Sequence, residues 1–205
     1  MQPLFALFPA AFVLLATLIS CTTGAAPETG LKAYNAAMDL HLADKDPEAE
    51  KAARALVAAS TKSLGAKDAE TLRARLLLAT ILHSEKRNTE AESLLRDLLT
   101  QTLGAEDVDT LDCRSELILT LSAQDKNAAA AAECRRLIPL QTKVHGADAA
   151  ETLLTRRCLA IALSAQGKLS ESEQEYRRVL ALMTKKEGPE NRQTLLQRSY
   201  FSSVL

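Results

Sequence analysis

Three carboxylates stand close together in the stretch LGAEDVDTL, between Leu103 and Leu111, and closely spaced carboxylates can bind a cation. A calcium loop of the EF-hand type needs ligands at alternating positions over about twelve residues and ends in a bidentate glutamate. Glu106, Asp107 and Asp109 do not follow that pattern. A structural role fits better, because a glycine suits the end of one helix and an aspartate three positions later can cap the next. We therefore predict no metal site in this loop.

The histidines are the next candidate ligands and catalytic bases. His41, His83 and His145 have no nucleophile or carboxylate in register with them, which a catalytic role requires. The sequence also has no P-loop, nucleophile–base pair or metal-ligand spacing. We expect surface histidines, and a protein that is not an enzyme and holds no metal or cofactor.

The cysteines beyond the N-terminal region are Cys113, Cys134 and Cys158, and no two of them have the C-x-x-C spacing of a metal site. In an oxidising compartment one disulfide can form among them, and the sequence does not choose the pair. Cys134 occupies an apolar position of a repeating pattern, so we predict that it is a small core residue.

The first 20 residues form a hydrophobic, signal-peptide-like segment without charged side chains. It ends in LISC, from Leu18 to Cys21, which resembles the lipobox of bacterial lipoproteins. The resemblance implies cleavage before Cys21, a lipid on its sulfur, and attachment to a membrane. An ordinary signal peptide and an uncleaved anchor remain as alternatives, and residues 21–28 read as a flexible tether.

This segment predicts a location at the cell envelope of a bacterium. Thr22 follows the cysteine where aspartate would favour the inner membrane, so we prefer an outer membrane facing the periplasm. The alternative is a secreted or periplasmic soluble protein.

The composition predicts an all-α protein that does not bind nucleic acid. The 205 residues carry a formal net charge of -1, whereas nucleic-acid binders need a basic surface. Aromatic residues make up only 3% and tryptophan is absent, so stacking platforms for bases are not expected. Alanine and leucine dominate, and both favour helices.

Four related copies of the opening stretch show that the chain is built from repeats: GAKDAETL, GAEDVDTL, GADAAETL and GPENRQTL. Their glycines, Gly65, Gly104, Gly146 and Gly188, are 39, 42 and 42 residues apart. The three residues missing from the second unit fall between Arg96 and Gly104, near the end of its second helix. We predict that each unit is a hairpin of two helices, A and B, whose loops are joints capped by Asp68, Asp107 and Asn191. An arginine recurs in the A helices at Arg75, Arg114, Arg156 and Arg198.

The unit from Thr152 to Leu195, TLLTRRCLAIALSAQGKLSESEQEYRRVLALMTKKEGPENRQTL, resembles the 42-residue, kinesin-light-chain-like form of the tetratricopeptide repeat. The resemblance implies an all-α superhelical array, or α-solenoid, of about four hairpins plus a C-terminal ninth helix. The repeat domain would span 29–205, with units at about 29–64, 65–103, 104–145 and 146–187 and a final helix in 188–205. Helix A of the first unit should begin near Thr29. Adjacent units lie about a helix diameter apart, too far for His41 and His83 to share a zinc ion.

The resemblance implies that an unknown protein or peptide binds the concave face formed by the A helices. The kinesin-like form commonly carries RNNLA there, but this chain has RLLLA, RSELI, RRCLA and RSYFS, so the backbone clamp made by those asparagines is not expected. The residues that we expect on this face are Arg73, Thr80, His83, Asp112, Ser115, Ser122, Arg157 and Ser164. The alternative is a fragment or remnant of a larger array with no ligand of its own.

Two further features concern the second half of the chain. Pro139 lies inside a B helix, where it removes a backbone donor, so we predict a kink or an early end near Ile138. The last helix has no B helix after it, and terminal repeats normally present a polar outer face. We therefore expect that this end can associate with another copy or a partner through Tyr200, Phe201, Val204 and Leu205.

Overall fold

The computed structural model describes residues 27–101 and 104–204, and within them it contains nine α helices and no strand. Residues 1–26, which include Cys21 and most of the expected tether, and Leu205 lie outside the described residues. The helices are α1 (Pro27–Leu42), α2 (Asp46–Leu64), α3 (Ala69–Ser84), α4 (Asn88–Leu99), α5 (Val108–Ala123), α6 (Asn127–Val144), α7 (Ala150–Ala165), α8 (Leu169–Glu187) and α9 (Arg192–Val204).

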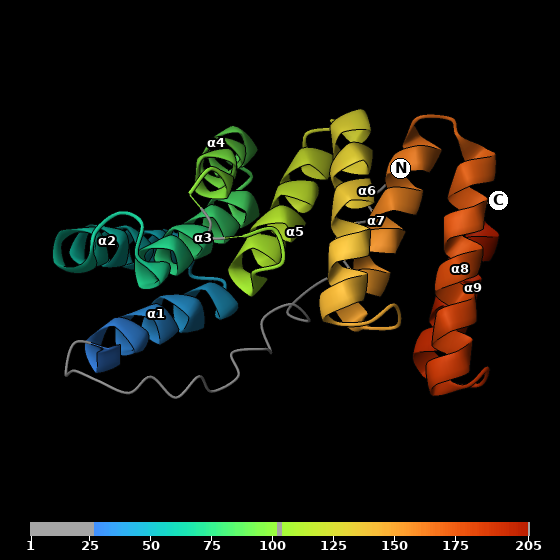
Figure 1. Cartoon of the computed structure of the whole chain (residues 1–205), viewed down its shortest axis with the longest axis horizontal. Helices are drawn as coiled ribbons and strands as arrows, with labels where there is room; N and C mark the ends of the chain where they lie inside the picture. The colour runs from blue at the N-terminus through green and yellow to red at the C-terminus, as the bar shows by residue number, and fades with distance from the viewer. Residues whose placement is uncertain (1–26, 102–103, 205) are drawn as a thin grey trace.

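Figure 1 shows the hairpins side by side along the molecule, from α1–α2 at one end to α7–α8 and α9 at the other, with helix axes that turn progressively. Each helix packs against the next one in the chain. The A helices α1, α3, α5 and α7 also contact one another in succession, whereas no two B helices in the described part of the chain do. The array therefore curves toward the A helices, and the predicted solenoid of four hairpins and a ninth helix is confirmed.

The joints between hairpins have the predicted caps. Asp68 and Asp107 each accept a hydrogen bond from a backbone N–H in the first turn of α3 and α5, at 2.9 and 3.3 Å. Asn191 accepts one at 2.8 Å at the start of α9. Gly65 has a φ of 97°, a backbone conformation that a residue with a Cβ rarely adopts. The acidic loop is thus a helix joint, because its aspartate satisfies a backbone donor that the helix leaves unpaired.

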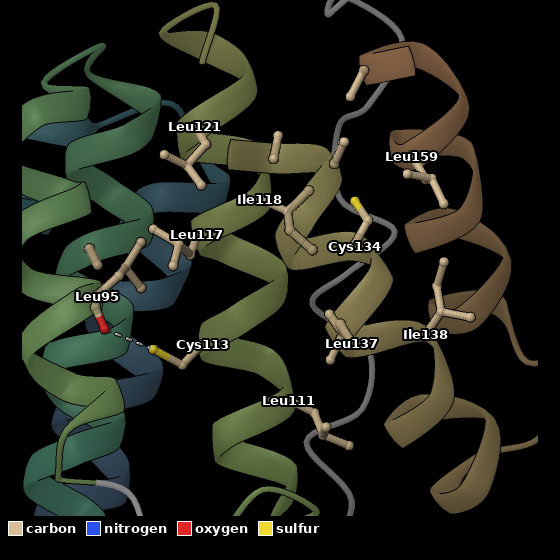
Figure 2. Close-up of a cluster of buried hydrophobic side chains, with 14 of the residues drawn as sticks. Leu95, Leu111, Cys113, Leu117, Ile118, Leu121, Cys134, Leu137, Ile138 and Leu159 are labelled. Atoms are coloured by element: carbon tan, nitrogen blue, oxygen red, sulfur yellow. Dashed lines mark hydrogen bonds between the residues drawn. The ribbon is translucent and has the colours of Figure 1, made fainter. Parts of the chain in front are cut away.

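The apolar core consists of two clusters, one in the first two hairpins and a larger one that extends from α3 to α7. Figure 2 shows its central part, where leucines from α4, α5 and α6 interlock and Ile138 and Leu159 extend the cluster toward α7. Leu95, Leu137 and Cys134 are fully buried, which confirms the prediction for Cys134. Since each hairpin buries its apolar face only against its neighbours, stability is shared along the array.

The second unit has a shortened B helix, as the spacing predicts. Helix α4 has 12 residues, whereas α2, α6 and α8 have 19, 18 and 19. The three-residue deletion is therefore absorbed where α4 ends, at Leu99, and the packing of α4 against α3 and α5 is kept.

Of the kink or early end predicted near Ile138, the early end is wrong, because α6 continues through Pro139 to Val144. The ring of Pro139 faces solvent, while Leu137 and Ile138 before it and Gln141 after it are buried against neighbouring helices. These tertiary contacts hold both halves of the helix in place, so the missing hydrogen bond does not end it.

Replacing Pro139 with alanine is expected to raise the free energy of unfolding by about 1–3 kcal/mol. Alanine restores the backbone donor that proline lacks and removes no buried side chain. Urea unfolding followed by circular dichroism measures the change. An unchanged or lower midpoint would show that the helix has relaxed around the proline and gains nothing from its removal.

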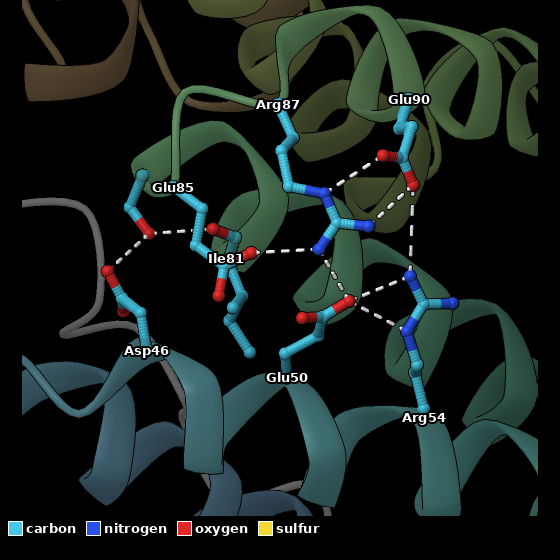
Figure 3. Close-up of polar contacts among 8 residues, drawn as sticks. Asp46, Glu50, Arg54, Ile81, Glu85, Arg87 and Glu90 are labelled. Atoms are coloured by element: carbon cyan, nitrogen blue, oxygen red, sulfur yellow. Dashed lines mark hydrogen bonds and ion pairs between the residues drawn. The ribbon is translucent and has the colours of Figure 1, made fainter.

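Ion pairs join neighbouring hairpins on the outer side of the array. In Figure 3, the guanidinium of Arg87 reaches Glu50 on α2 at 2.7 Å and Glu90 on α4 at 2.7 Å. Arg54 pairs with Glu50 at 2.8 Å, and hydrogen bonds from both arginines hold the pKa of Glu50 below its ordinary value. Arg54 and Glu90 are exposed and Arg87 and Glu50 are half-buried, so each pair contributes little, and the network mainly fixes the register between the first two hairpins.

Candidate functional site

The solvent-facing side chains of α1, α3, α5 and α7 form a surface that we call the inner wall. Seven of the eight residues predicted for the concave face are exposed or half-buried there: Arg73, Thr80, His83, Asp112, Ser122, Arg157 and Ser164. The eighth, Ser115, is buried and lies off this surface. Its hydroxyl donates to the carbonyl of Leu111 at 3.0 Å and accepts from Nε2 of Gln141 at 3.3 Å, so it serves the interior.

One group of inner-wall residues lies toward the N-terminal ends of the A helices. Nε of Arg73 on α3 donates to both carboxylate oxygens of Asp109 on α5 at 3.0 Å, which ties the second unit to the third. Burial, reinforced by Asp109, raises the pKa of Asp112 to about 6. The pKa of Tyr34 on α1 is also raised, first by burial and then by these two carboxylates. Residues from three units therefore share one electrostatic environment.

A second group lies toward the C-terminal ends of α1 and α3. Nδ1 of His41 donates to Asp46 at 2.8 Å, and Nδ1 of His83 donates to the side-chain oxygen of Asn88 at 2.7 Å. Both histidines are half-buried, so the surface position expected for them is only partly realised: each ties the end of an A helix to the start of its B helix. Burial raises the pKa of Glu116 on α5, and His83 and His41 oppose this shift.

Sequence reasoning missed Glu116 and Tyr34. Glu116 stands where the second unit has Leu77, which is buried, and the fourth has Cys158. A carboxylate where the second and fourth units have apolar residues was the available signal. Tyr34 could have been noticed as one of only three tyrosines in the chain.

The inner wall offers no metal or nucleophile chemistry within the described ranges. There, no group of three or more His, Cys, Asp or Glu side chains is placed to hold a metal ion. Cys113, Cys134 and Cys158 are free thiols. Burial raises the pKa of Cys113 to about 12 and that of Cys158 to about 11, which makes both poor nucleophiles at neutral pH.

Replacing Asp112 with asparagine is expected to stabilise the protein at neutral pH. The carboxyl titrates near 3.8 when unfolded and near 6 when folded, so between these values the folded state holds the extra proton. The free energy of unfolding therefore falls as pH rises through this window, and above pH 6 the charge costs up to about 3 kcal/mol. The variant should gain about 1–3 kcal/mol at pH 7.5 and nothing below pH 3.8.

Thermal unfolding at both pH values measures the effect. Asp39→Asn, at an exposed position of α1, removes the same charge and is the matched control. Equal stabilisation by both variants would assign the gain to net charge and not to the surroundings of Asp112.

Comparisons with known proteins bear on the fold. A family model for the tetratricopeptide repeat matches residues 152–193. Two crystal structures of nearly identical TPR-like repeats, from a Podosopora anserina protein assigned as a kinesin light chain, match the array with TM-scores of 0.79 and 0.78. Both are 20% identical in sequence; they cover 89% and 87% of this chain and 87% and 86% of their own. The fold is a tetratricopeptide-like solenoid. No curated protein matches the chain significantly.

Tetratricopeptide-repeat proteins are generally non-enzymatic scaffolds for protein interaction. In this tetratricopeptide-like solenoid the positions of the two asparagines of RNNLA are taken by Leu76 and Leu77, then by Ser115 and Glu116. Leu77 and Ser115 are buried, so these positions cannot act together as an amide clamp. Among the described residues, no helix is long and apolar enough to cross a membrane.

Proposed function

We propose that the chain is a non-enzymatic scaffold whose inner wall binds a protein or peptide. One observation carries this proposal: polar side chains stand at equivalent solvent-facing positions of successive A helices, and the hydrophobic core does not need them. His41, His83, Ser122 and Ser164 form one such row. A row of this kind, on helices that contact one another, presents a continuous surface to a partner that spans several repeats.

Site-specific photo-crosslinking tests the position of the partner. A photoreactive phenylalanine analogue at Thr80 would face the inner wall, and the same analogue at Ser93, exposed on α4, is the matched control. In an extract of the source organism, a protein crosslinked through position 80 and not through position 93 supports the proposal. If both positions crosslink the same proteins, or if neither crosslinks any protein, the proposal is contradicted. That result favours an array without its own ligand.

We further propose that the scaffold is held at a bacterial cell envelope by a lipid on Cys21. The support is the hydrophobic segment that ends in LISC, followed by a short polar tether before α1. Radioactive palmitate should label the wild-type protein in bacterial cells and should not label Cys21→Ala. Equal labelling of both would contradict lipidation, and release of the unlabelled wild type from membranes would favour the secreted or periplasmic alternative.

Helix α9 supports a second proposal, association with another copy of the chain. Of the described helices it packs against α8 alone, and on it Leu195 is 40% and Leu196 54% exposed. Of the residues predicted for this contact, Phe201 instead lies with its ring 5.6 Å from that of Tyr176. Light scattering of the protein with and without residues 194–205 decides the matter, since a monomer in both cases excludes association through α9.

A further inference from the structure

Two acidic side chains of the inner wall lack a hydrogen bond or ion pair within the described part of the chain. Asp112 and Glu116 stand one turn apart on α5, and no hydrogen bond or ion pair joins either to another described residue. Glu116 is half-buried: its Oε1 is closed off from solvent and accepts no hydrogen bond, while the residue as a whole stays partly exposed. A polar atom enclosed without a partner destabilises the free protein, so the arrangement is consistent with a donor supplied from outside.

Three nearby basic groups are already engaged. Arg73 is held by Asp109, and the Nδ1 atoms of His41 and His83 donate to Asp46 and Asn88. Four other charged groups act on Asp112: Asp107 and Asp109 at the start of α5, His145 after α6, and Glu151 on α7. Three of these four are carboxylates, so the surroundings of Asp112 favour a cation.

The spacing of the two carboxylates specifies the cation further. Four residues along a helix advance it by about 6 Å, and side chains on one face of an extended peptide repeat every two residues, or about 6.6 Å. We propose that α5 presents a receptor for an extended segment of a partner protein that carries two basic side chains at alternate positions, Lys-x-Lys or Arg-x-Arg. One basic group pairs with Asp112 and the other with Glu116. This inference rests on the proposed binding wall and names the class of its partner.

The site gives binding a definite pH dependence. Both carboxyl groups have raised pKa values in the free protein, that of Asp112 reaching about 6, and a bound cation favours their ionised forms. Binding therefore releases protons, and affinity rises between pH 5 and pH 8. His41 and His83 face Glu116 from α1 and α3 and oppose the rise of its pKa.

Binding of short labelled peptides to the full chain tests the proposal. The probe is fluorescein-Gly-Ala-Ser-Lys-Ser-Lys-Ser-Ala-Gly, measured by fluorescence anisotropy at pH 5 and pH 8. One comparison peptide carries acetyl-lysine at both positions, and another places the two lysines next to each other. We expect the alternating peptide to bind at least tenfold more tightly than the acetylated one, several-fold more tightly than the adjacent one, and more tightly at pH 8.

Protein variants locate the contact. Asp112→Asn and Glu116→Gln keep the side-chain shape and should each weaken binding at least fivefold. Glu171→Gln, which removes the same charge at an exposed position of α8, should leave it unchanged. Equal affinity for the alternating and acetylated peptides, or equal losses in all three variants, would overturn the proposal. Photo-crosslinking through position 80 would still report a partner in that case. The two experiments therefore distinguish failure of this inference from failure of the proposal that the inner wall binds a partner.

Discussion

Replacing Tyr176 with alanine is expected to destabilise the C-terminal end of the array by about 3–5 kcal/mol. Tyr176 is 1% exposed and is among the largest fully buried side chains of the described residues. Its ring lies 5.6 Å from that of Phe201 at an angle of 41°, a geometry in which aromatic pairs attract each other. Among the described helices α9 contacts only α8, so loss of this ring removes much of what holds it.

The effect should be local, because a repeat array gains its stability from nearest neighbours. Hydrogen exchange should become fast throughout α9 and the facing turns of α8, while α3 to α5 keep their protection. Tyr176→Phe keeps the ring contact and is the control, with an expected loss below about 1.5 kcal/mol. Uniform loss of protection along the whole chain would instead show that the array unfolds as a single cooperative unit.

The fold could be predicted from the sequence because the repeats make it redundant. Four copies of one joint revealed the hairpin, and Asp68, Asp107 and Asn191 could be recognised as caps because a cap depends only on the residues next to it. Cys134 could be placed in the core because Leu95 and Tyr176 stand at the same repeat position and are buried with it. Each of these inferences uses local sequence or alignment between units.

The details of the inner wall depend on contacts between units and could not be predicted in this way. Ser115 aligns with residues on the surface, yet Gln141 and Thr155 enclose it in a buried set of hydrogen bonds. Glu116 is distinctive only because His83 and His41 come close to it from two other hairpins. The helix end near Ile138 was predicted wrongly for the same reason, since packing against neighbours outweighs one missing backbone bond.

The recurring arginines of the A helices show both what the sequence could predict and what it could not. Their register was visible in the sequence, whereas their partners come from the B helix of the same hairpin. From the second unit to the fourth, Arg75 pairs with Asp97, Arg114 with Glu133, and Arg156 with Glu175. Glu133 and Glu175 are buried, so their pairs hold the two helices of a hairpin together in a place that water scarcely reaches, whereas Asp97 is exposed.

Replacing Arg156 with alanine is therefore expected to lower the free energy of unfolding by about 2–4 kcal/mol. The guanidinium lies 3.0 Å from Glu175, with only 18% and 10% of the two side chains exposed, and its removal leaves a buried carboxylate. Arg178 still reaches the other oxygen of Glu175 at 2.6 Å, which keeps the loss below that of a fully unpaired charge.

Urea unfolding of a single and a double variant separates the cost of the unpaired charge from the contribution of the pair. Arg156→Met combined with Glu175→Leu should recover most of the stability that Arg156→Ala loses, because no buried charge remains and apolar side chains fill the space. Arg177→Ala, which breaks the exposed pair with Glu173 on the same hairpin, should cost less than about 0.5 kcal/mol. If the double variant is no more stable than Arg156→Ala, the pair itself, and not relief of a buried charge, stabilises the hairpin. The recurring arginine would then be a source of stability in each unit. If the double variant instead recovers the full free energy of unfolding, the role of the arginine is to fix how the A and B helices align.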